Sequence, residues 1–353
     1  MLEDLQTLVE VESPSRDVEA LTASARTVAQ VVERRLGGRA VVLESDVGPH
    51  VHWCGGGEPK VLVLGHHDTV FPVGTLERRP FRVTDGRATG PGVFDMLGGL
   101  VQAIHGLAQL EDLSGVELLV TSDEEVGSSS SRPLIEERAL ACGAVLVCEG
   151  AAPGGALKTG RKGTGGFEVT VTGRASHAGL EPDAGVNALV EAAHQVLHIA
   201  GLGRPEDGTS VTPTVASAGT ADNVVPAEAT VLVDVRIETA EEKERIERAF
   251  AALTPRLEGA AISVRGGVRR PPMPESVSAE LFATAQRLLP GIESTSVGGG
   301  SDGNFTAALG VPTLDGLGAV GGGAHADHEY VVIDSMPERA HLIAGLVRTL
   351  QSR

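Results

Sequence analysis

Two histidines and an aspartate follow a short apolar run near residue 65, in the stretch LGHHDTV. The run Val61–Leu64 is aliphatic and rich in β-branched residues, which predicts a buried parallel strand covered on both faces. Because side chains alternate along an extended chain, His66 and Asp68 should point to one side and His67 to the other. An imidazole beside a carboxylate at a strand end suits a metal ligand, although a histidine hydrogen-bonded for structure leaves the same pattern.

Acids and histidines recur where other predicted elements meet loops. Asp95 lies in the Gly-rich loop GPGVFDMLGG, which leads into a helix, and TSDEEVGS and CEG follow the predicted strands Val116–Thr121 and Ala144–Cys148. The residues concerned are Asp123, Glu124, Glu125 and Glu149, joined by His325 and Glu329 in a late loop. Like charges gathered at one crevice repel each other unless a cation neutralises them. Two histidines and several carboxylates would suit two divalent ions, with Zn²⁺ favoured over Mg²⁺ or Ca²⁺.

The composition narrows the classes of function. The chain has 353 residues, a formal net charge of −18 and only 3% aromatic residues. The negative charge argues against nucleic-acid or anionic-membrane partners, which require clustered Lys and Arg. Three cysteines without a CxxC pair predict small buried side chains rather than a disulfide framework. The acidic N-terminus lacks the pattern of a signal peptide, and no apolar run is long enough to span a membrane, so we expect a cytoplasmic protein.

The pattern of elements predicts an α/β protein with a mostly parallel sheet, interrupted by a second domain. Strands alternate with helices up to residue 163, with Ser15 as a candidate N-cap and a helix expected over Gly98–Leu110. Strict alternation in TGGFEVTVTGRAS then indicates a half-exposed antiparallel strand, the first element of a β-α-β-β-α-β order. We therefore expect residues 1–163 and 271–353 to form the α/β domain, and residues 164–270 an inserted ferredoxin-like domain.

Six motifs occur in an order that resembles a known family. GHHDTV, GPGVFDMLGG, TSDEEVGS, CEG, SHAG and AHADHEYV resemble the M20 family of dinuclear zinc amidohydrolases and peptidases. The resemblance extends over nearly the whole chain, and DEEVGS, ASHAG and DNVVPAEATVLVDVR are specific in combination. It is greatest to the glutamate carboxypeptidase branch. In this family the inserted domain acts as a lid and forms a homodimer.

The resemblance implies a set of metal ligands. His66 and Glu149 would hold one zinc ion, Glu125 and His325 would hold the other, and Asp95 would bridge the two. It therefore implies two Zn²⁺ per subunit, with Co²⁺ or Mn²⁺ as alternatives. The family usually has a lysine two residues after the bridging aspartate, where this chain has Leu97; that lysine is not a ligand, but contacts around Asp95 are expected to differ.

Catalytic roles are implied in the same way. Asp68 would accept a hydrogen bond from the second ring nitrogen of His66 and so orient it. Glu124 resembles the family's general base, which takes a proton from the attacking water and returns it to the leaving amine. His177, in SHAG, would reach the active site of the partner subunit and steady the oxyanion.

Four further residues are implied to contact substrate: Asn223, Arg236, Arg270 and Gly300. A guanidinium suits a substrate carboxylate because it offers paired charge-assisted hydrogen bonds. For Arg236, at the end of an alternating strand, a surface ion pair is an equal alternative. Gly300 lies in the loop GGGSDGNF, which resembles the family loop that lets substrate approach backbone N–H groups, although ordinary tight turns have the same composition.

The sequence thus predicts a zinc-dependent hydrolase that cleaves an amide bond next to a free carboxylate in a small peptide or N-acyl amino acid. Release of a C-terminal amino acid, with glutamate favoured, competes with deacylation of an N-acyl amino acid by the same metal core. A basic or apolar residue at the cleaved bond is also compatible with the motifs. A binding protein on an inactive hydrolase scaffold is disfavoured, because Glu124 and all five candidate ligands are present.

Overall fold

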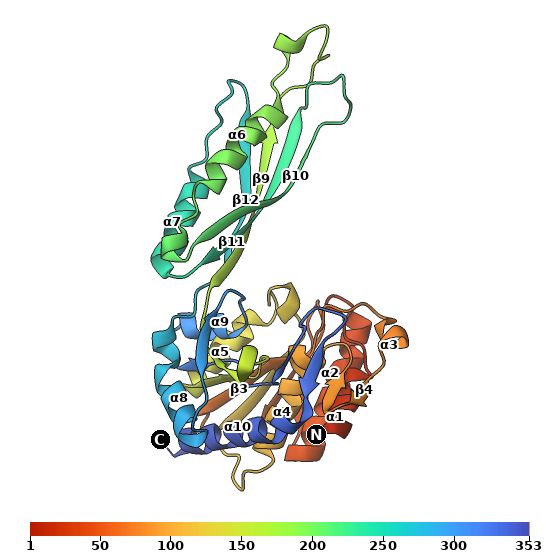
Figure 1. Cartoon of the computed structure of the whole chain (residues 1–353), viewed down its shortest axis with the longest axis vertical. Helices are drawn as coiled ribbons and strands as arrows, with labels where there is room; N and C mark the ends of the chain where they lie inside the picture. Colours follow the sequence, from red (N-terminus) through yellow and green to blue (C-terminus); the bar gives the residue numbers. More distant parts are fainter. Residues whose placement is uncertain (353) are drawn as a thin grey trace. The chain divides into compact units, whose positions relative to one another are not determined.

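The computed structural model describes residues 1–352, and these residues form two compact units (Figure 1). Unit 1 contains Met1–Gly160, Met273–Val297 and Ser301–Arg353, of which the last residue lies outside the described part. Unit 2 contains Arg161–Pro272 and Gly298–Gly300. The inserted unit is thus slightly longer than the expected 164–270, and it includes three glycines from a later loop.

Unit 1 is built on a six-stranded sheet in the order β1-β2-β6-β3-β7-β14. Strands β6, β3, β7 and β14 run parallel, whereas β1 and β2 are antiparallel additions at one edge. This confirms the prediction of an α/β fold with a mainly parallel sheet. The strands are β1 (Ala40–Leu43), β2 (His50–Cys54), β3 (Val61–His66), β6 (Val116–Thr121), β7 (Val145–Val147) and β14 (Thr313–Leu314).

Helices cover both faces of this sheet. Side chains of β3 alternate between two cores: Val61 and Val63 pack with α1, α2, α4, α8 and α10, whereas Leu62 and Leu64 pack with α5 and α9. All six residues of β3 are buried, which accounts for its unbroken apolar sequence. The helices of unit 1 are α1 (Leu2–Val9), α2 (Val18–Leu36), α3 (Thr75–Arg78), α4 (Gly98–Leu107), α5 (Arg132–Cys142), α8 (Glu275–Leu288), α9 (Gly303–Ala308) and α10 (Met336–Gln351).

Three local expectations were wrong. The N-cap of α2 is Asp17, whose side chain accepts from the N–H of Ala20, and not Ser15. Helix α4 ends at Leu107 rather than residue 110. Cys54 is exposed, because it lies at the end of β2 near the sheet edge, while the other two cysteines are buried as expected.

Two small sheets complete unit 1. One has the strand order β15-β16-β5-β4, and its pairing of β16 with β5 joins the late loop to the loop that carries Asp95. The other pairs β13 with β8. These strands are β4 (Arg82–Thr84), β5 (Arg87–Thr89), β8 (Leu157–Arg161), β13 (Ser294–Val297), β15 (Gly321–Gly322) and β16 (Tyr330–Val332).

Unit 2 is an antiparallel sheet with two helices on one face (Figure 1). The elements are β9 (Gly163–Thr172), α6 (Ala188–Ala200), β10 (Ser210–Ala218), β11 (Glu228–Ile237), α7 (Ala240–Ala251) and β12 (Ala261–Arg270). The sheet order is β10-β11-β9-β12. Alternate residues of β9 and β11 are buried under the helices, and Phe167 stacks on Phe250 with ring centroids 3.8 Å apart. This alternation is what a sheet with one covered face requires.

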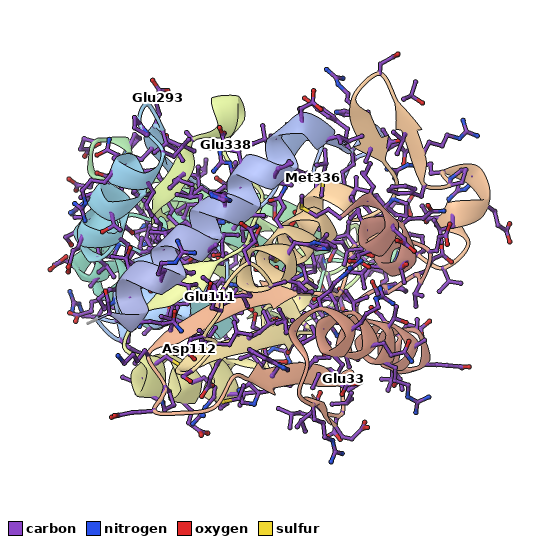
Figure 2. All side chains as sticks on the ribbon, turned by 90° about the horizontal axis from the view of Figure 1, so that it is seen from below. Glu33, Glu111, Asp112, Glu293, Met336 and Glu338 are labelled. Carbon is purple, nitrogen blue, oxygen red and sulfur yellow. The ribbon has the colours of Figure 1, made fainter. Side chains whose placement is uncertain are left out.

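The surface of unit 1 carries much of the acidic charge. Figure 2 labels five exposed acids on four different segments. They are Glu33, Glu111, Asp112, Glu293 and Glu338. Among residues 1–352, no helix is both long and apolar enough to cross a lipid bilayer.

A buried ion cluster joins the first helices of unit 1. The carboxylate of Asp4 is fully buried and accepts from Arg34 Nη2 at 2.6 Å, Arg35 Nε at 2.7 Å and His105 Nε2 at 2.6 Å. Burial alone would raise the pKa of Asp4, but the hydrogen bonds from Arg35, His105 and Arg34 lower it far below its usual range. Asp4 therefore contributes stability above about pH 4 that is lost as the pH falls further.

Replacing Asp4 by Asn should lower the free energy of unfolding at neutral pH by roughly 1.5–3 kcal/mol, the range for hydrogen bonds to charged groups. The difference from wild type should shrink as the pH falls below about 4, because unfolded wild type then takes up a proton that native Asp4 does not. Urea unfolding across pH measures both effects, with the exposed Glu3→Gln as the matched control. A D4N variant as stable as wild type at neutral pH would contradict this role.

Candidate metal centre

The sheet order explains how the candidate ligands in unit 1 meet. His66 is the last residue of β3, which lies between β6 and β7. Glu124 and Glu125 follow β6 in a one-turn helix, Glu124–Val126, and Glu149 follows β7. Because the three strands are parallel and adjacent, their carboxyl ends bring these side chains to one edge of the sheet. Asp95 and His325 reach the same place from loops.

The first cluster surrounds His66. Its Nε2 atom lies 3.6 Å from Asp95 Oδ1 and 3.6 Å from Glu149 Oε1, and it is buried without a hydrogen-bond partner. These separations are too long for hydrogen bonds. They are close to the spacing of two atoms that each lie about 2.0–2.2 Å from a shared zinc ion. The geometry therefore fits a metal ion between His66, Asp95 and Glu149.

The second cluster surrounds His325. Its Nε2 atom lies 3.4 Å from Asp95 Oδ2 and 3.0 Å from Glu125 Oε2. Asp95 thus directs one oxygen toward each histidine, which is the geometry required of a bridging carboxylate. His325 has a φ of 61°, in the left-handed region that few residues other than glycine adopt, a conformation often found at functional sites.

The carboxylates strongly favour positive charge at both histidines. Burial would lower the pKa of His66, but Asp68, Asp95 and Glu149 outweigh it and raise that pKa well above its usual value. Hydrogen bonds to Asp95 and Glu125 raise the pKa of His325 to about 10. Without a metal ion, protonated His66 and His325 would supply the positive charge in these two clusters. A divalent ion would take the place of those protons, so the same electrostatics favour metal binding.

Asp68 lies fully buried beneath this centre. His66 Nδ1 lies 2.9 Å from the main-chain oxygen of Asp68 and 3.4 Å from its carboxylate, so the nearer acceptor is the main chain, not the side chain expected. The carboxylate instead accepts from the backbone N–H groups of Glu124 and Glu125, at 3.1 and 3.2 Å, and from Ser15 Oγ at 2.7 Å. Asp68 thus holds the segment that carries both glutamates, which the sequence did not reveal.

His67 points away from the centre. It is fully buried, with Nδ1 3.0 Å from Ser24 Oγ and Nε2 3.1 Å from the main-chain oxygen of Pro49. Burial lowers the pKa of His67 to about 4, so its ring is neutral at physiological pH. Both ring nitrogens are thus occupied in fixing the strand end, which leaves His66 as the histidine of this pair available to a metal.

Glu329 is a buried carboxylate next to the centre whose contacts the sequence did not predict. It is fully buried and accepts from the backbone N–H groups of Gly92, Phe94 and Asp95, each at 2.9 Å. Burial raises the pKa of Glu329 to about 7, although the three N–H donors oppose this shift. The sequence indicated only that an acid follows shortly after His325. The groups that donate to it are backbone N–H groups, which residue types do not reveal.

Two of the remaining candidates meet at one end of unit 2. His177 is exposed and forms a bridge with Val224, while the main-chain oxygen of Asn223 accepts from the N–H of Ala178. His177 Nδ1 accepts from the N–H groups of Gly179 and Leu180, both at 3.1 Å. With Nδ1 used as an acceptor, the proton of the neutral ring resides on Nε2, which can donate outward.

The other three meet at the opposite end of the sheet of unit 2. Arg236 and Arg270 both pair with Thr164 in the sheet register, and a side chain at Gly300 would contact Arg270 and Thr164 at 3.0 Å. Arg236 also binds Asp234 through two 3.0 Å hydrogen bonds, which is the ion pair left open by the sequence. At about 3.3 Å per residue along β9, Thr164 and Thr172 lie about 26 Å apart, and His177 follows the far end.

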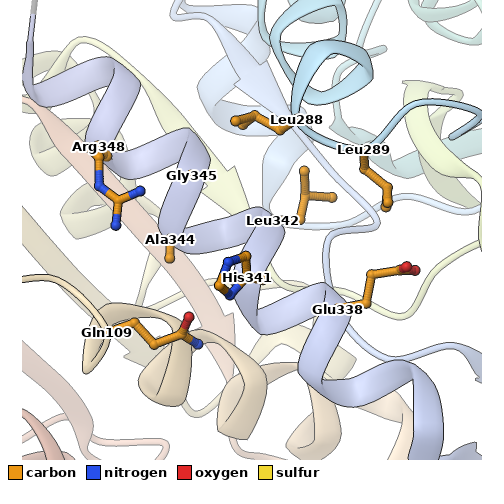
Figure 3. A pocket seen from close by; sticks show the side chains of 9 residues that line it. All are labelled: Gln109, Leu288, Leu289, Glu338, His341, Leu342, Ala344, Gly345 and Arg348. Atoms are coloured by element: carbon orange, nitrogen blue, oxygen red, sulfur yellow. The ribbon is translucent and has the colours of Figure 1, made fainter.

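A hollow of about 240 Å³ lies elsewhere in unit 1, where α8 and α10 meet the end of α4 (Figure 3). It is lined by Gln109, Leu288, Leu289, Glu338, His341, Leu342, Ala344, Gly345 and Arg348. None of the candidate site residues is among those that line it. The candidate metal centre, rather than this hollow, gathers the chemically active side chains.

Comparison with known proteins identifies the class. Residues 62–349 match the model of peptidase family M20/M25/M40. The chain belongs to this family and is a hydrolase, as the order of its motifs indicated.

Individual relatives indicate the class of reaction. The chain is 33% identical to carboxypeptidase G2 of Pseudomonas sp. (strain RS-16), covering 99% of this chain and 89% of the relative. It is 27% identical to succinyl-diaminopimelate desuccinylase of Thioalkalivibrio sulfidiphilus, covering 84% and 85%. The fold resembles that of an M20 family metallo-carboxypeptidase from Sulfolobus solfataricus, with a TM-score of 0.76, 17% identity and coverage of 100% and 99%. Amide hydrolysis is therefore the supported reaction class.

We expect metal-stripped protein to bind two Zn²⁺ per chain. Because Asp95 faces both clusters, Asp95→Asn should weaken both binding steps, whereas His66→Ala and His325→Ala should each abolish one. Each loss should exceed the roughly 10–100-fold typical of a residue that only supports a ligand. Calorimetric titration with Zn²⁺ measures this, with the exposed His341→Asn as control. Two ions bound by H66A with wild-type affinity would contradict the assignment.

Proposed function

We propose that the protein is a two-zinc hydrolase that releases a C-terminal amino acid, with glutamate favoured, from a small peptide or N-acyl amino acid. The observation that carries this proposal is the position of Glu124. Ligand atoms of Glu124, His66 and Glu149 all lie within 4.8 Å of one another. A carboxylate beside a metal cluster is what amide hydrolysis by water needs. The 33% identity to carboxypeptidase G2 supports the choice of a C-terminal bond, and glutamate is the product that the resemblance of the motifs implies.

The chain's own residues supply proton transfer in this proposal. When bound, the two ions would polarise the amide carbonyl and acidify the attacking water. Glu124 takes the proton of that water on its carboxylate and gives it to the leaving nitrogen. The N–H of Glu124 donates to Asp68, so the main chain that carries the base is held in place before substrate arrives.

Guanidinium groups of unit 2 would hold the free carboxylate of the substrate. Arg270 lies next to Gly300, and Arg161 donates to the main-chain oxygens of Gly299 and Gly300, which ties the glycine loop to the same unit. A planar guanidinium offers two parallel N–H groups to a carboxylate. We assign the carboxylate clamp to Arg270 and to Arg236, which would exchange its contact with Asp234 for the substrate, and Gly300 would lie beside them. Asn223 lies with His177 at the other end of the sheet, so it would contact the substrate of the partner subunit.

His177 would serve the partner subunit of a homodimer. It follows the end of β9 that is remote from both points where the chain enters and leaves unit 2. Its Nε2–H group is available to stabilise a developing oxyanion. The surface of unit 2 offers an apolar patch on α6, where Val190 and Leu197 lie two turns apart and are 43% and 74% exposed. Val215 on β10 pairs with the exposed Leu232, so it lies on the opposite face of the sheet. Strand β10 is also an edge strand.

Deacylation of an N-acyl amino acid is the second candidate. The 27% identity to succinyl-diaminopimelate desuccinylase favours it, because that relative's name denotes removal of an acyl group from an amino acid. The same metal core and base would serve both reactions. The two candidates differ in which side of the cleaved amide fits the substrate pocket.

Activity should separate these candidates. The zinc-loaded protein should release glutamate from N-acyl-glutamates and from dipeptides ending in glutamate, and it should act less well on N-succinyl or N-acetyl diamino acids. Glu124→Gln should lower kcat by about 10²–10⁴-fold, the contribution typical of a general acid–base residue. Amino-acid release measured by chromatography checks both expectations.

The exposed Glu293→Gln serves as control, and the metal content of E124Q should equal that of wild type. Faster cleavage of the N-succinyl or N-acetyl diamino acids would favour the deacylase. An E124Q variant with wild-type kcat would refute the base assignment.

The dimer has its own test. Wild type should sediment with the mass of two chains, and Leu197→Glu should sediment as one chain, because a charge on the apolar surface of α6 opposes burial. Leu140→Glu is the matched control, since Leu140 is similarly exposed but lies on α5. Activity of L197E should fall with its dimer content if His177 acts across subunits. Single-chain sedimentation of wild type at micromolar concentration would contradict the proposal.

A further inference from the structure

Glu329 lies between two loops that come from distant parts of the sequence. Its backbone belongs to the loop that carries His325, just before β16. Its side chain lies against residues 92–95, the loop that carries Asp95. The two loops are already neighbours because β16 pairs with β5, with Tyr330 opposite Thr89. The pairing of β16 with β5 brings the two loops together, but it does not fix the main chain of Asp95.

The contacts of Glu329 fix that main chain directly. Oε1 accepts from the N–H groups of Phe94 and Asp95, and Oε2 accepts from Gly92, each at 2.9 Å. No part of the side chain is exposed to solvent. Three N–H donors converging on one buried carboxylate form a tight anion nest, in which each bond is charge-assisted. The nest includes the N–H of Asp95 itself.

We propose that Glu329 is a positioning residue that sets the bridging carboxylate of Asp95 between His66 and His325. Asp95 must direct one oxygen to each histidine, at 3.6 and 3.4 Å, so a small rotation of its backbone would spoil both contacts. Glu329 ties the Asp95 loop to the loop that carries His325, so the bridging ligand and a ligand of one ion are held as a pair. This inference rests on the proposed two-metal function.

The test compares Glu329→Gln with a matched buried carboxylate in unit 2. Glu191 is also fully buried and accepts from Gln195 Nε2 and from the N–H groups of Arg256 and Leu257. None of these three partners is a candidate metal ligand. A Gln at either position turns one acceptor into a donor that faces an N–H group. Both variants should therefore lose stability, which makes metal affinity the deciding quantity.

Titration of metal-stripped protein with Co²⁺, followed by visible absorption, should show binding of both ions weakened by about 10–100-fold in E329Q, with an altered spectrum. E191Q should bind Co²⁺ as wild type does. Glu329→Asp keeps the charge but withdraws it by one methylene, so it should also weaken both steps. At saturating Co²⁺, kcat of E329Q should stay low while KM changes little, because the defect lies in ligand geometry rather than substrate binding.

Wild-type Co²⁺ affinity and spectrum in E329Q and E329D would overturn the proposal. Failure of both variants to fold even with Co²⁺ present would also overturn it, in favour of a purely structural role. Failure of the proposed function would look different: wild type would bind fewer than two ions, or E124Q would stay active.

Discussion

Electrostatic repulsion among buried carboxylates is the constraint on which this active-site region depends. Asp68, Asp95, Glu124, Glu125 and Glu149 gather where the parallel strands of unit 1 end, and two histidines face them. Such a cluster costs stability unless cations lie within it. The raised pKa values of His66 and His325 express the same requirement through protons. Divalent ions would meet it, and the candidate ligand atoms already lie at suitable spacing.

Strand order and buried hydrogen bonds fix the main chain from which these carboxylates extend. The order β6-β3-β7 places Glu124 and Glu125 on one side of His66 and Glu149 on the other. Asp68 then accepts from the N–H groups of Glu124 and Glu125, and Glu329 does the same for the Asp95 loop. Two buried acids, Asp68 and Glu329, thus hold the main chain of the residues proposed as base and ligands. Preorganisation of this kind lets metal and substrate bind without reordering the site.

The sequence predicted the parts of this arrangement that follow from periodicity and strand direction. Alternation along β3 separated His66 from His67, and the parallel strands predicted one shared edge for the acids. Contacts between segments distant in the sequence could not be predicted from residue patterns. Ser15 has the residue type of an N-cap, yet its hydroxyl binds Asp68 and Asp17 caps the helix. Glu329 binds only main-chain donors, which no residue pattern encodes. Strand β2 joins the sheet antiparallel, an edge addition without a distinctive sequence signal.

The most direct test of a two-metal centre is a crystal structure of the zinc-loaded protein, measured with anomalous scattering at the zinc absorption edge. The account predicts two anomalous peaks about 3.5–4 Å apart, as in known two-metal sites, with Asp95 between them. His66 and Glu149 should bind one ion, and Glu125 and His325 the other. A single peak, or peaks away from these residues, would contradict the central claim.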